Sequence, residues 1–291
     1  MLKFRSSNLL ATTLLALSLS TACVRAQDLE KFADTTRLVS IGGSLTEIIF
    51  ALGEEGRLVA RDQTALFPEA ALALPDVGYM RQLAPEGVLS VSPTALLVLE
   101  GSGPPEALEV LSHAGVEYQT VPESYSGDGV VAKIRAVGEA LGVEDKAEAY
   151  ATETAQQFTD LAARVAKITE PKRVLFVLST DGGKIQASGT GTAADGILKL
   201  AGAVNAIDEY SGYKALTEEA IIDAAPDVIL MMDRGGDHGA TDAELVGNPA
   251  IALTEAGKNH AIIRMEGAYL LGFGPRTAAA ATELADKLYA E

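Results

Sequence analysis

Short apolar segments alternate with amphipathic segments along the chain from residue 37 to its end. A short apolar run between turn residues predicts a buried strand, and apolar residues spaced three and four apart predict a helix. The predicted strands are Arg37–Ile41, Arg57–Ala60, Ala95–Leu99, Glu117–Val121, Arg173–Leu178, Asp227–Met232 and Ala261–Arg264. The predicted helices are Pro85–Val91, Pro105–Ala114, Asp128–Leu141, Thr192–Ala201 and Pro275–Tyr289, together with one that begins at Ser44, where Ser44 and Glu47 have capping-box spacing. This alternation is typical of a mostly parallel sheet that is covered by helices.

Residues 144–168 follow a different pattern. Apolar residues recur there at helical spacing with charged and amide residues between them, and no glycine or proline interrupts until Pro171. One helix of roughly 25 residues is about 37 Å long at 1.5 Å per residue. We expect this helix to cross between two lobes as a rigid connection.

The two halves of the chain repeat each other. Residues 83–100 align without a gap on residues 216–233, and each copy contains a short helix, a proline, an apolar strand and a final acidic residue. Open α/β sheets bind ligands at the carboxyl ends of their strands, so the loops after Leu99 and Met232 are expected to face a common cleft. The predicted fold class is α/β, with two Rossmann-like lobes whose central, mostly parallel sheets are joined by one long helix. The predicted limits are 27–143 for the N-terminal lobe, 144–168 for the helix and 169–291 for the C-terminal lobe.

The first 26 residues are expected to be a signal peptide. Lys3 and Arg5 precede an apolar stretch, and residues 24–26 end in the small-residue pattern that a signal peptidase cleaves. Residues 20–23 offer the alternative of a lipid anchor on Cys23, but Ser20 stands where a large aliphatic residue is usual. We therefore favour ordinary cleavage and a periplasmic protein.

Net charge narrows the possible partners. Cleavage after residue 26 removes three positive charges and no acidic residue, so the net charge goes from −17 to −20. So acidic a chain repels nucleic acid and anionic membrane surfaces. Acidic surface is suited to docking on a basic patch of a membrane partner.

Tyr79 lies on a glycine-hinged loop, Asp76–Leu83, with Arg81 two residues further on. A free phenol has a pKa near 10, and a neighbouring arginine lowers the cost of ionising it. Tyrosine is one of the few protein ligands of haem iron. The alternative for the loop alone is a half-buried tyrosine beside a solvated arginine.

With these features, the chain resembles a known class of proteins. A signal peptide, two α/β lobes and a long connecting helix are similar to the helical-backbone substrate-binding proteins of ABC importers, and within that class the chain resembles the periplasmic haem-binding proteins. The resemblance covers essentially the whole mature chain. Its most specific parts are residues 40–49, 77–83, 231–235 and 271–276. Residues 77–83 are the part that points to haem.

The resemblance implies that Tyr79 coordinates ferric haem b through its phenolate oxygen. It implies that Arg234 reaches that oxygen from the other lobe, whereas a surface pairing with a nearby aspartate is the alternative. Arg81 is expected either to assist Tyr79 or to hold a haem propionate. Met80 and Met232 are expected to contact the apolar macrocycle, because methionine adapts its shape.

The chain departs from some relatives at Thr180, where they carry a histidine that binds iron, so we expect Tyr79 alone and five-coordinate iron. The main alternative function is a ferric-siderophore or corrinoid carrier of the same fold. We predict no enzyme activity, because no nucleophile elbow, Walker lysine or full dinucleotide motif is present. A metal loop around His238 is the less favoured reading of an acidic surface loop. The expected partner is an inner-membrane ABC permease, and the protein is expected to be a monomer.

Overall fold

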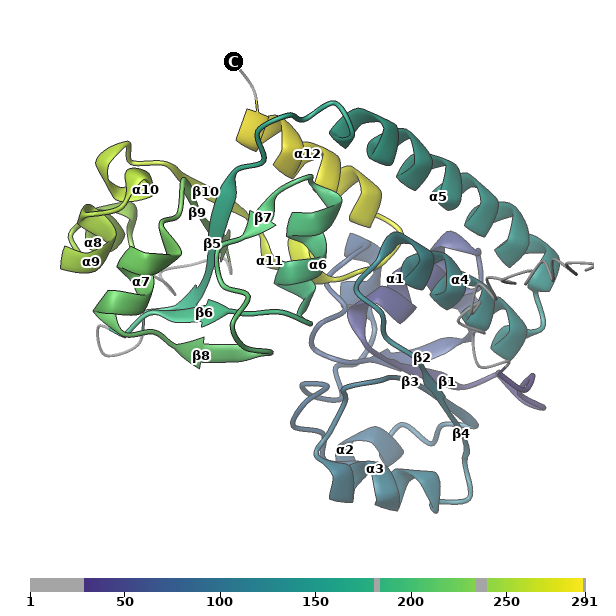
Figure 1. The fold of residues 1–291 in the computed structure, drawn as a ribbon. Helices are drawn as coiled ribbons and strands as arrows, with labels where there is room; N and C mark the ends of the chain where they lie inside the picture. The colour runs from purple at the N-terminus through teal and green to yellow at the C-terminus, as the bar shows by residue number, and fades with distance from the viewer. Residues whose placement is uncertain (1–28, 181–183, 234–239, 290–291) are drawn as a thin grey trace, which may run out of the picture.

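The computed structural model describes residues 29–180, 184–233 and 240–289 of the chain. These residues form two α/β lobes, each built on its own sheet (Figure 1). The long helix α5 (Glu144–Val165) passes over the first lobe and ends beside the second. This architecture confirms the predicted fold class. The predicted signal peptide and Cys23 lie outside the described residues.

The sheet of the first lobe consists of parallel strands. Its strands are β1 (Leu38–Ile41), β2 (Leu58–Arg61), β3 (Ala95–Leu99) and β4 (Glu117–Val121). They lie in the order β2-β1-β3-β4, so β1 and β3 are central. Every residue of these two central strands is buried, which explains why Ser40 is their only polar residue.

The first lobe also contains four helices and two 3-10 turns among its described residues. They are α1 (Gly43–Ala51), η1 (Glu55–Arg57), η2 (Glu69–Ala73), α2 (Pro85–Leu89), α3 (Pro105–Ser112) and α4 (Gly127–Leu141). The capping box predicted at Ser44 is wrong, because α1 begins one residue earlier and no side chain caps it. Gly42 precedes α1 with φ 120°, and a Cβ at Gly42 would lie 2.6 Å from Cβ of Leu99. Glu47 instead accepts hydrogen bonds from Arg276, far along the chain.

The sheet of the second lobe combines parallel and antiparallel strands. They are β5 (Arg173–Ser179), β6 (Gln186–Ser188), β7 (Val204–Asn205), β8 (Tyr213–Ala215), β9 (Val228–Asp233) and β10 (Ile262–Glu266). Strands β7, β5, β9 and β10 are parallel and match the order of the first sheet. Strands β6 and β8 extend the sheet as an antiparallel ribbon, which the apolar pattern did not predict.

The helices of the second lobe vary from one turn to three or four turns. They are α6 (Ala193–Leu200), α7 (Glu218–Ala224), α8 (Asp242–Val246), α9 (Pro249–Ala252), α10 (Glu255–Lys258), α11 (Gly267–Leu271) and α12 (Thr277–Tyr289). Helix α12 lies beneath α5 in Figure 1 and packs against α5 and α6. It therefore belongs to the contact between the lobes as well as to the second lobe.

Helix α5 begins where predicted and ends three residues before the expected residue 168. At 1.5 Å per residue its length is about 33 Å. It packs along α4 of the first lobe, and Val165 at its end lies against Gly202 of the second. The predicted lobe limits at residues 143 and 169 remain predictions.

The two copies of the internal repeat also share backbone conformations and hydrogen bonds. Ser92 and Ala225 occupy the same position in the two copies, and both adopt a left-handed conformation, with φ 50° and 42°. Arg37 and Arg173 stand at the start of the first central strand of each lobe. The guanidinium of Arg37 donates to the carbonyl oxygen of Val91, and that of Arg173 donates to the equivalent carbonyl of residue 224. Such matched detail supports duplication over chance similarity.

The two lobes meet at a buried lysine. The side chain of Lys133 on α4 is 0% exposed, and its ammonium donates to both carboxylate oxygens of Glu123 at 2.7 and 2.8 Å. The same ammonium donates to the carbonyl oxygen of Phe273, which lies between α11 and α12, at 3.0 Å. Tyr125 packs edge-on against the Phe273 ring, with 5.2 Å between ring centroids. A Cβ on Gly196 of α6 would lie 2.5 Å from the carbonyl oxygen of Tyr125, so only glycine fits this contact.

Candidate ligand-binding site

The loop that carries Tyr79 is fixed by backbone hydrogen bonds. The amide of Gln63 donates to the carbonyl oxygen of Gly78 at 2.8 Å, and the amide of Gly78 donates to the Asp76 carboxylate at 2.8 Å. Gly78 has φ 103°, a conformation that other residues rarely adopt. The amide of Gln82 then donates to the carbonyl oxygen of Tyr79 at 2.8 Å, which closes a turn around the tyrosine.

A second loop of the first lobe holds the Tyr79 loop from the side. The amide of Gly103 donates to the carbonyl oxygen of Met80 at 2.8 Å, and the amide of Leu83 donates back to the carbonyl oxygen of Gly103 at 2.9 Å. Gly103 belongs to the loop that follows β3. The Tyr79 loop therefore lies at the carboxyl end of the first sheet, beside the loop after Leu99 that was predicted to face the cleft.

Asp62 supports the same region from beneath. Its side chain is fully buried and accepts hydrogen bonds from the amides of Gly42 and Thr64, each at 2.9 Å. Burial raises the pKa of Asp62, and hydrogen bonds from Thr64, Gly42 and the Met80 backbone oppose that rise. Asp62 thus joins the turn before α1 to the Tyr79 loop. A single aspartate after a strand carries no sequence signal for this role.

Arg81 lies directly beside the Tyr79 phenol. Its Nη1 donates to the Tyr79 hydroxyl oxygen at 2.8 Å. Burial lowers the pKa of Arg81, but the hydrogen bond to Tyr79 and the electrostatic interactions with Tyr79, Tyr125 and Tyr213 together outweigh this and leave the pKa above its usual value. A permanently charged guanidinium therefore points at the oxygen that is predicted to bind iron. Of the two roles predicted for Arg81, this contact matches assistance to Tyr79.

Two further phenols lie within electrostatic reach of Arg81, one from each lobe. Tyr125 belongs to the loop after β4, and Tyr213 is the first residue of β8. Burial raises the pKa of Tyr125, and Glu123 raises it further. Burial also raises the pKa of Tyr213. Both phenols are therefore neutral at neutral pH. Tyr213 was missed in the sequence, since an aromatic residue beside a glycine has no distinctive pattern.

The other predicted site residues are either at least partly buried or lie outside the described residues. Met80 is 6% exposed and packs in the main core, and Met232 is half-buried on β9. Thr180 is half-buried and directly follows β5. Arg234 lies outside the described residues, as does His238. The contacts predicted for all of these residues remain predictions.

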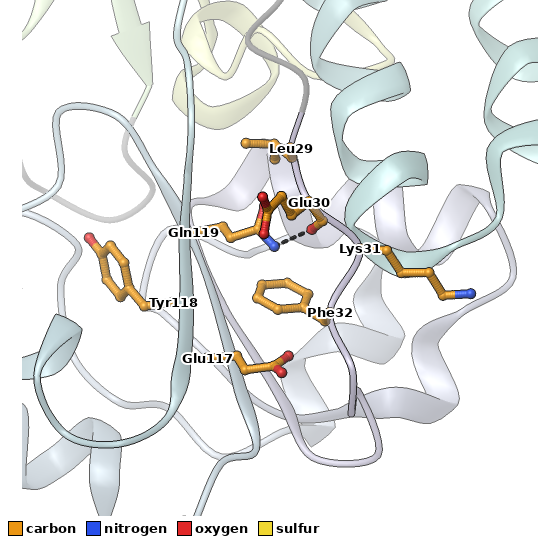
Figure 2. Close-up of a pocket in the computed structure, with 7 residues that line it drawn as sticks. All are labelled: Leu29, Glu30, Lys31, Phe32, Glu117, Tyr118 and Gln119. Carbon is orange, nitrogen blue, oxygen red and sulfur yellow. Dashed lines mark hydrogen bonds between the residues drawn. The ribbon is translucent and has the colours of Figure 1, made fainter.

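A cavity of about 380 Å³ lies at the N-terminal end of the described chain (Figure 2). It is lined by Leu29, Glu30, Lys31, Phe32, Glu117, Tyr118 and Gln119. Figure 2 shows the N-terminal segment beside β4, with the Gln119 amide donating to the carbonyl oxygen of Glu30. Tyr79 and the other predicted site residues do not line this cavity, so we do not assign the ligand to it.

Metal-binding and membrane-spanning features were sought in the same described residues. There, no group of three or more His, Cys, Asp or Glu side chains is arranged to hold a metal ion. Within residues 29–180, 184–233 and 240–289, no helix has both the length and the apolar character needed to cross a membrane.

Comparison with known proteins identifies the family. The periplasmic binding protein family matches residues 38–269. The chain belongs to this family. Its members are substrate-binding transport proteins rather than enzymes. The two lobes and the connecting helix are therefore the architecture of a periplasmic binding protein.

Solved structures of this family resemble the chain over most of its length. The chain is 38% identical to the periplasmic haem-binding protein BhuT in complex with two haems, with a TM-score of 0.82, over 87% of this chain and 97% of that one. It is 37% identical to the periplasmic haem-binding protein RhuT of Roseiflexus sp. RS-1 in apo form, with a TM-score of 0.83, over 88% of this chain and 98% of that one.

Curated relatives are more distant. An uncharacterised ABC transporter substrate-binding lipoprotein, YvrC of Bacillus subtilis (strain 168), is 27% identical over 267 residues, which is 90% of this chain and 83% of that protein. A vitamin B12-binding protein of Yersinia pestis (strain Pestoides F) is 25% identical over 200 residues, which is 67% of this chain and 69% of that protein.

Proposed function

We propose that this periplasmic binding protein captures ferric haem between its two lobes and delivers it to an inner-membrane ABC permease. The observation that carries the proposal is the 2.8 Å hydrogen bond from Arg81 Nη1 to the Tyr79 hydroxyl oxygen. A phenolate is a ligand that haem proteins use, and a fixed positive charge favours the ionised form of a phenol. The haem-binding proteins at 37–38% identity support the same ligand class.

Tyr79 is the proposed axial ligand of the haem b iron, and Arg81 stabilises its phenolate. Arg234 is proposed to approach the same oxygen from the second lobe. Thr180 stands where some relatives carry a histidine, and threonine is not among the usual haem ligands, so the proposed iron is five-coordinate. Met80 and Met232 are proposed to contact the macrocycle.

The corrinoid or siderophore alternative makes a different demand on the site. Neither ligand requires a phenolate oxygen from the protein, so an arginine that donates to the Tyr79 hydroxyl favours haem over them. The relative that binds vitamin B12 is also less similar to the chain than the haem-binding structures are. We therefore place this alternative second. Periplasmic location, a monomeric state, the absence of enzyme activity and ordinary cleavage rather than a lipid anchor on Cys23 belong to the same proposal.

The test is a visible-absorption titration with haemin of the wild type and of Tyr79→Phe, Arg81→Met and Tyr118→Phe. Wild type is expected to saturate near one equivalent with a high-spin ferric phenolate spectrum. Tyr79→Phe is expected to lose that spectrum and at least about 100-fold in affinity, and Arg81→Met about tenfold, since partners of a metal ligand contribute at this scale. Tyr118 lines the separate N-terminal cavity, so Tyr118→Phe is the matched control and is expected to behave as wild type.

A parallel titration with cyanocobalamin separates the alternatives. Saturable binding of cyanocobalamin together with weak, unsaturable binding of haemin would overturn the haem proposal in favour of a corrinoid. Tight haemin binding that survives Tyr79→Phe would keep the function and remove Tyr79 as the iron ligand.

A further inference from the structure

The internal repeat continues upstream of the aligned residues 83–100 and 216–233, to a Gly-Tyr pair in each lobe. Gly78-Tyr79 comes before the first copy, and Gly212-Tyr213 comes before the second, one residue nearer to it. Gly78 and Gly212 both adopt positive φ, 103° and 82°. A basic residue follows each tyrosine. Allowing for this shift of one residue, Tyr213 stands in the second lobe where Tyr79 stands in the first, at the approach to the repeated helix.

The basic residues that follow the two tyrosines behave differently. Arg81 donates to the Tyr79 hydroxyl oxygen, whereas the ammonium of Lys214 lies 4.8 Å from the ring centre of Tyr210. The Tyr213 oxygen lies instead within hydrogen-bonding reach of the Thr192 side chain and the Ala194 backbone, at the start of α6. The hydroxyl of Tyr213 is thus occupied within its own lobe. It lacks the arrangement that makes Tyr79 a candidate metal ligand.

The ring of Tyr213 is held in place but remains partly accessible. Phe176 contacts it edge-on, with 6.5 Å between ring centroids. The residue is 38% exposed, although its hydroxyl end is enclosed at the start of α6. A large aromatic ring with an anchored hydroxyl and an exposed portion is suited to stacking on a flat ligand.

Tyr213 lies near the contact between the lobes. Its strand partner Ser188 hydrogen-bonds Thr192 at the start of α6, at 2.5 Å, and a Cβ on Gly196 of α6 would lie 2.5 Å from the carbonyl oxygen of Tyr125 in the first lobe. Tyr213 pairs with Ser188 at the end of the β6–β8 ribbon, and in Figure 1 this ribbon extends from the second sheet toward the first lobe. The charge of Arg81 reaches Tyr213, although the two residues belong to different lobes. Tyr79 and Arg81 of the first lobe and Tyr213 of the second therefore lie near the same contact between the lobes.

We propose that Tyr213 is a ligand-binding residue whose ring stacks on the face of the haem macrocycle opposite Tyr79. The inference rests on the proposed function, since it assigns a role toward the same ligand. Tyr79 supplies the bond to iron, and Tyr213 supplies apolar contact and blocks the sixth coordination position without binding the metal. One duplicated Gly-Tyr pair thus carries two different roles.

The experiment measures the rate at which haemin leaves the protein for excess apomyoglobin, in wild type, Tyr213→Phe, Tyr213→Ala and Tyr118→Ala. Tyr213→Ala is expected to release haemin about tenfold faster, as stacking contacts of this size imply, while it keeps the phenolate spectrum. Tyr213→Phe retains the ring and is expected to release haemin within about twofold of wild type. Tyr118→Ala is the control for loss of a tyrosine ring elsewhere in the first lobe.

If Tyr213→Ala fails to fold, Tyr213→Trp carries the test. The chain has no tryptophan, so this variant contains a single one, and its fluorescence is expected to be quenched more fully by haemin than that of Tyr118→Trp. Release from Tyr213→Ala at the wild-type rate, or equal quenching of the two tryptophan variants, would overturn this inference and leave the haem proposal intact. A wild type that does not bind haemin would overturn both.

Discussion

In both lobes, an arginine at the start of one central strand hydrogen-bonds the backbone between the preceding helix and the next central strand, at or just after the end of that helix. Arg37 does so in the first lobe and Arg173 in the second. The amide of each arginine also donates to the side chain that follows the repeated proline, Thr94 or Asp227. Two hydrogen bonds of this framework are therefore the same in both lobes, one from the guanidinium and one from the amide of the arginine.

The lobes differ at the edge of the sheet beyond the first central strand. In the first lobe β2 fills this edge, and the loop after it leads to Tyr79. In the second lobe β7 covers only two residues of β5, and β6 and β8 occupy the remainder as an antiparallel ribbon. Duplication has kept the parts that stabilise each sheet and changed the parts that approach the ligand. Differences between the copies are thus the better guide to function.

The largest expected loss of unfolding free energy comes from a substitution of the buried lysine at the contact between the lobes. Lys133→Met removes a fully buried ammonium and leaves Glu123 as an unpaired buried charge, which is expected to cost about 3–5 kcal/mol of unfolding free energy. Arg135→Met, two residues along the same helix, breaks an exposed pair with Glu148 and is expected to cost less than about 1 kcal/mol. Urea unfolding at neutral pH measures both. Equal losses would contradict the special position of Lys133.

The next largest loss of unfolding free energy is expected from substitutions of the two arginines of the shared framework. Arg37→Met and Arg173→Met each remove charge-assisted hydrogen bonds to backbone carbonyls, and each is expected to cost about 1–2 kcal/mol of unfolding free energy. Arg164→Met, which removes a surface pair with Asp286, is the control and is expected to cost less than about 1 kcal/mol. A large loss at one of the two framework positions and none at the other would show that the matched hydrogen bonds are not equivalent in energy.

A smaller loss of stability is expected when one enclosed carboxylate in each lobe, Asp195 or Glu54, is replaced by its amide. Burial raises the pKa of Asp195, but hydrogen bonds from Lys199, Gly191 and Asn205 outweigh it and leave the pKa lowered. The pKa of Glu54 is likewise lowered, because hydrogen bonds from Lys146 and Arg57 outweigh burial.

A carboxylate whose pKa is lower in the folded protein contributes stability above its unfolded pKa and loses that stability as the pH falls through the folded pKa. Asp195→Asn and Glu54→Gln are each expected to cost about 1 kcal/mol at pH 7, and the difference from wild type is expected to vanish in acid. Thermal unfolding between pH 7 and pH 3 measures this. A difference that does not decrease between pH 7 and pH 3 would assign the loss to packing rather than to charge.

Apolar runs and repeated prolines were enough to predict the framework. Ala95–Leu99 was predicted at its observed limits, because a parallel strand buried on both faces has a nearly continuous apolar sequence. Glu117–Val121 was also predicted at its observed limits, although it is an edge strand in which only Val121 is buried. Strands β6, β7 and β8 were not predicted, since they contain two or three residues each and include polar side chains. Their pairing depends on neighbours that are distant in the sequence.

The site was predictable only in part. Tyr79 and Arg81 lie two residues apart, so their contact is local and one of two alternatives that the sequence left open. Lys133 was missed because lysine is almost never fully buried without a partner, and its partners lie on other segments. Glu47 was predicted to cap its own helix, yet it pairs with Arg276, which follows it by more than two hundred residues.

The buried ammonium of Lys133 also determines what happens when the lobes separate. Its ion pair with Glu123 lies within the first lobe, and only its hydrogen bond to the Phe273 carbonyl crosses to the second. Loss of this hydrogen bond removes a contact with a neutral acceptor, worth about 1.5–3 kcal/mol, and leaves the ammonium paired with Glu123. Water can replace the lost carbonyl. The ion pair between Glu47 and Arg276 also joins the lobes, so a separation of the lobes has to break an ion pair there but leaves the charge of Lys133 compensated.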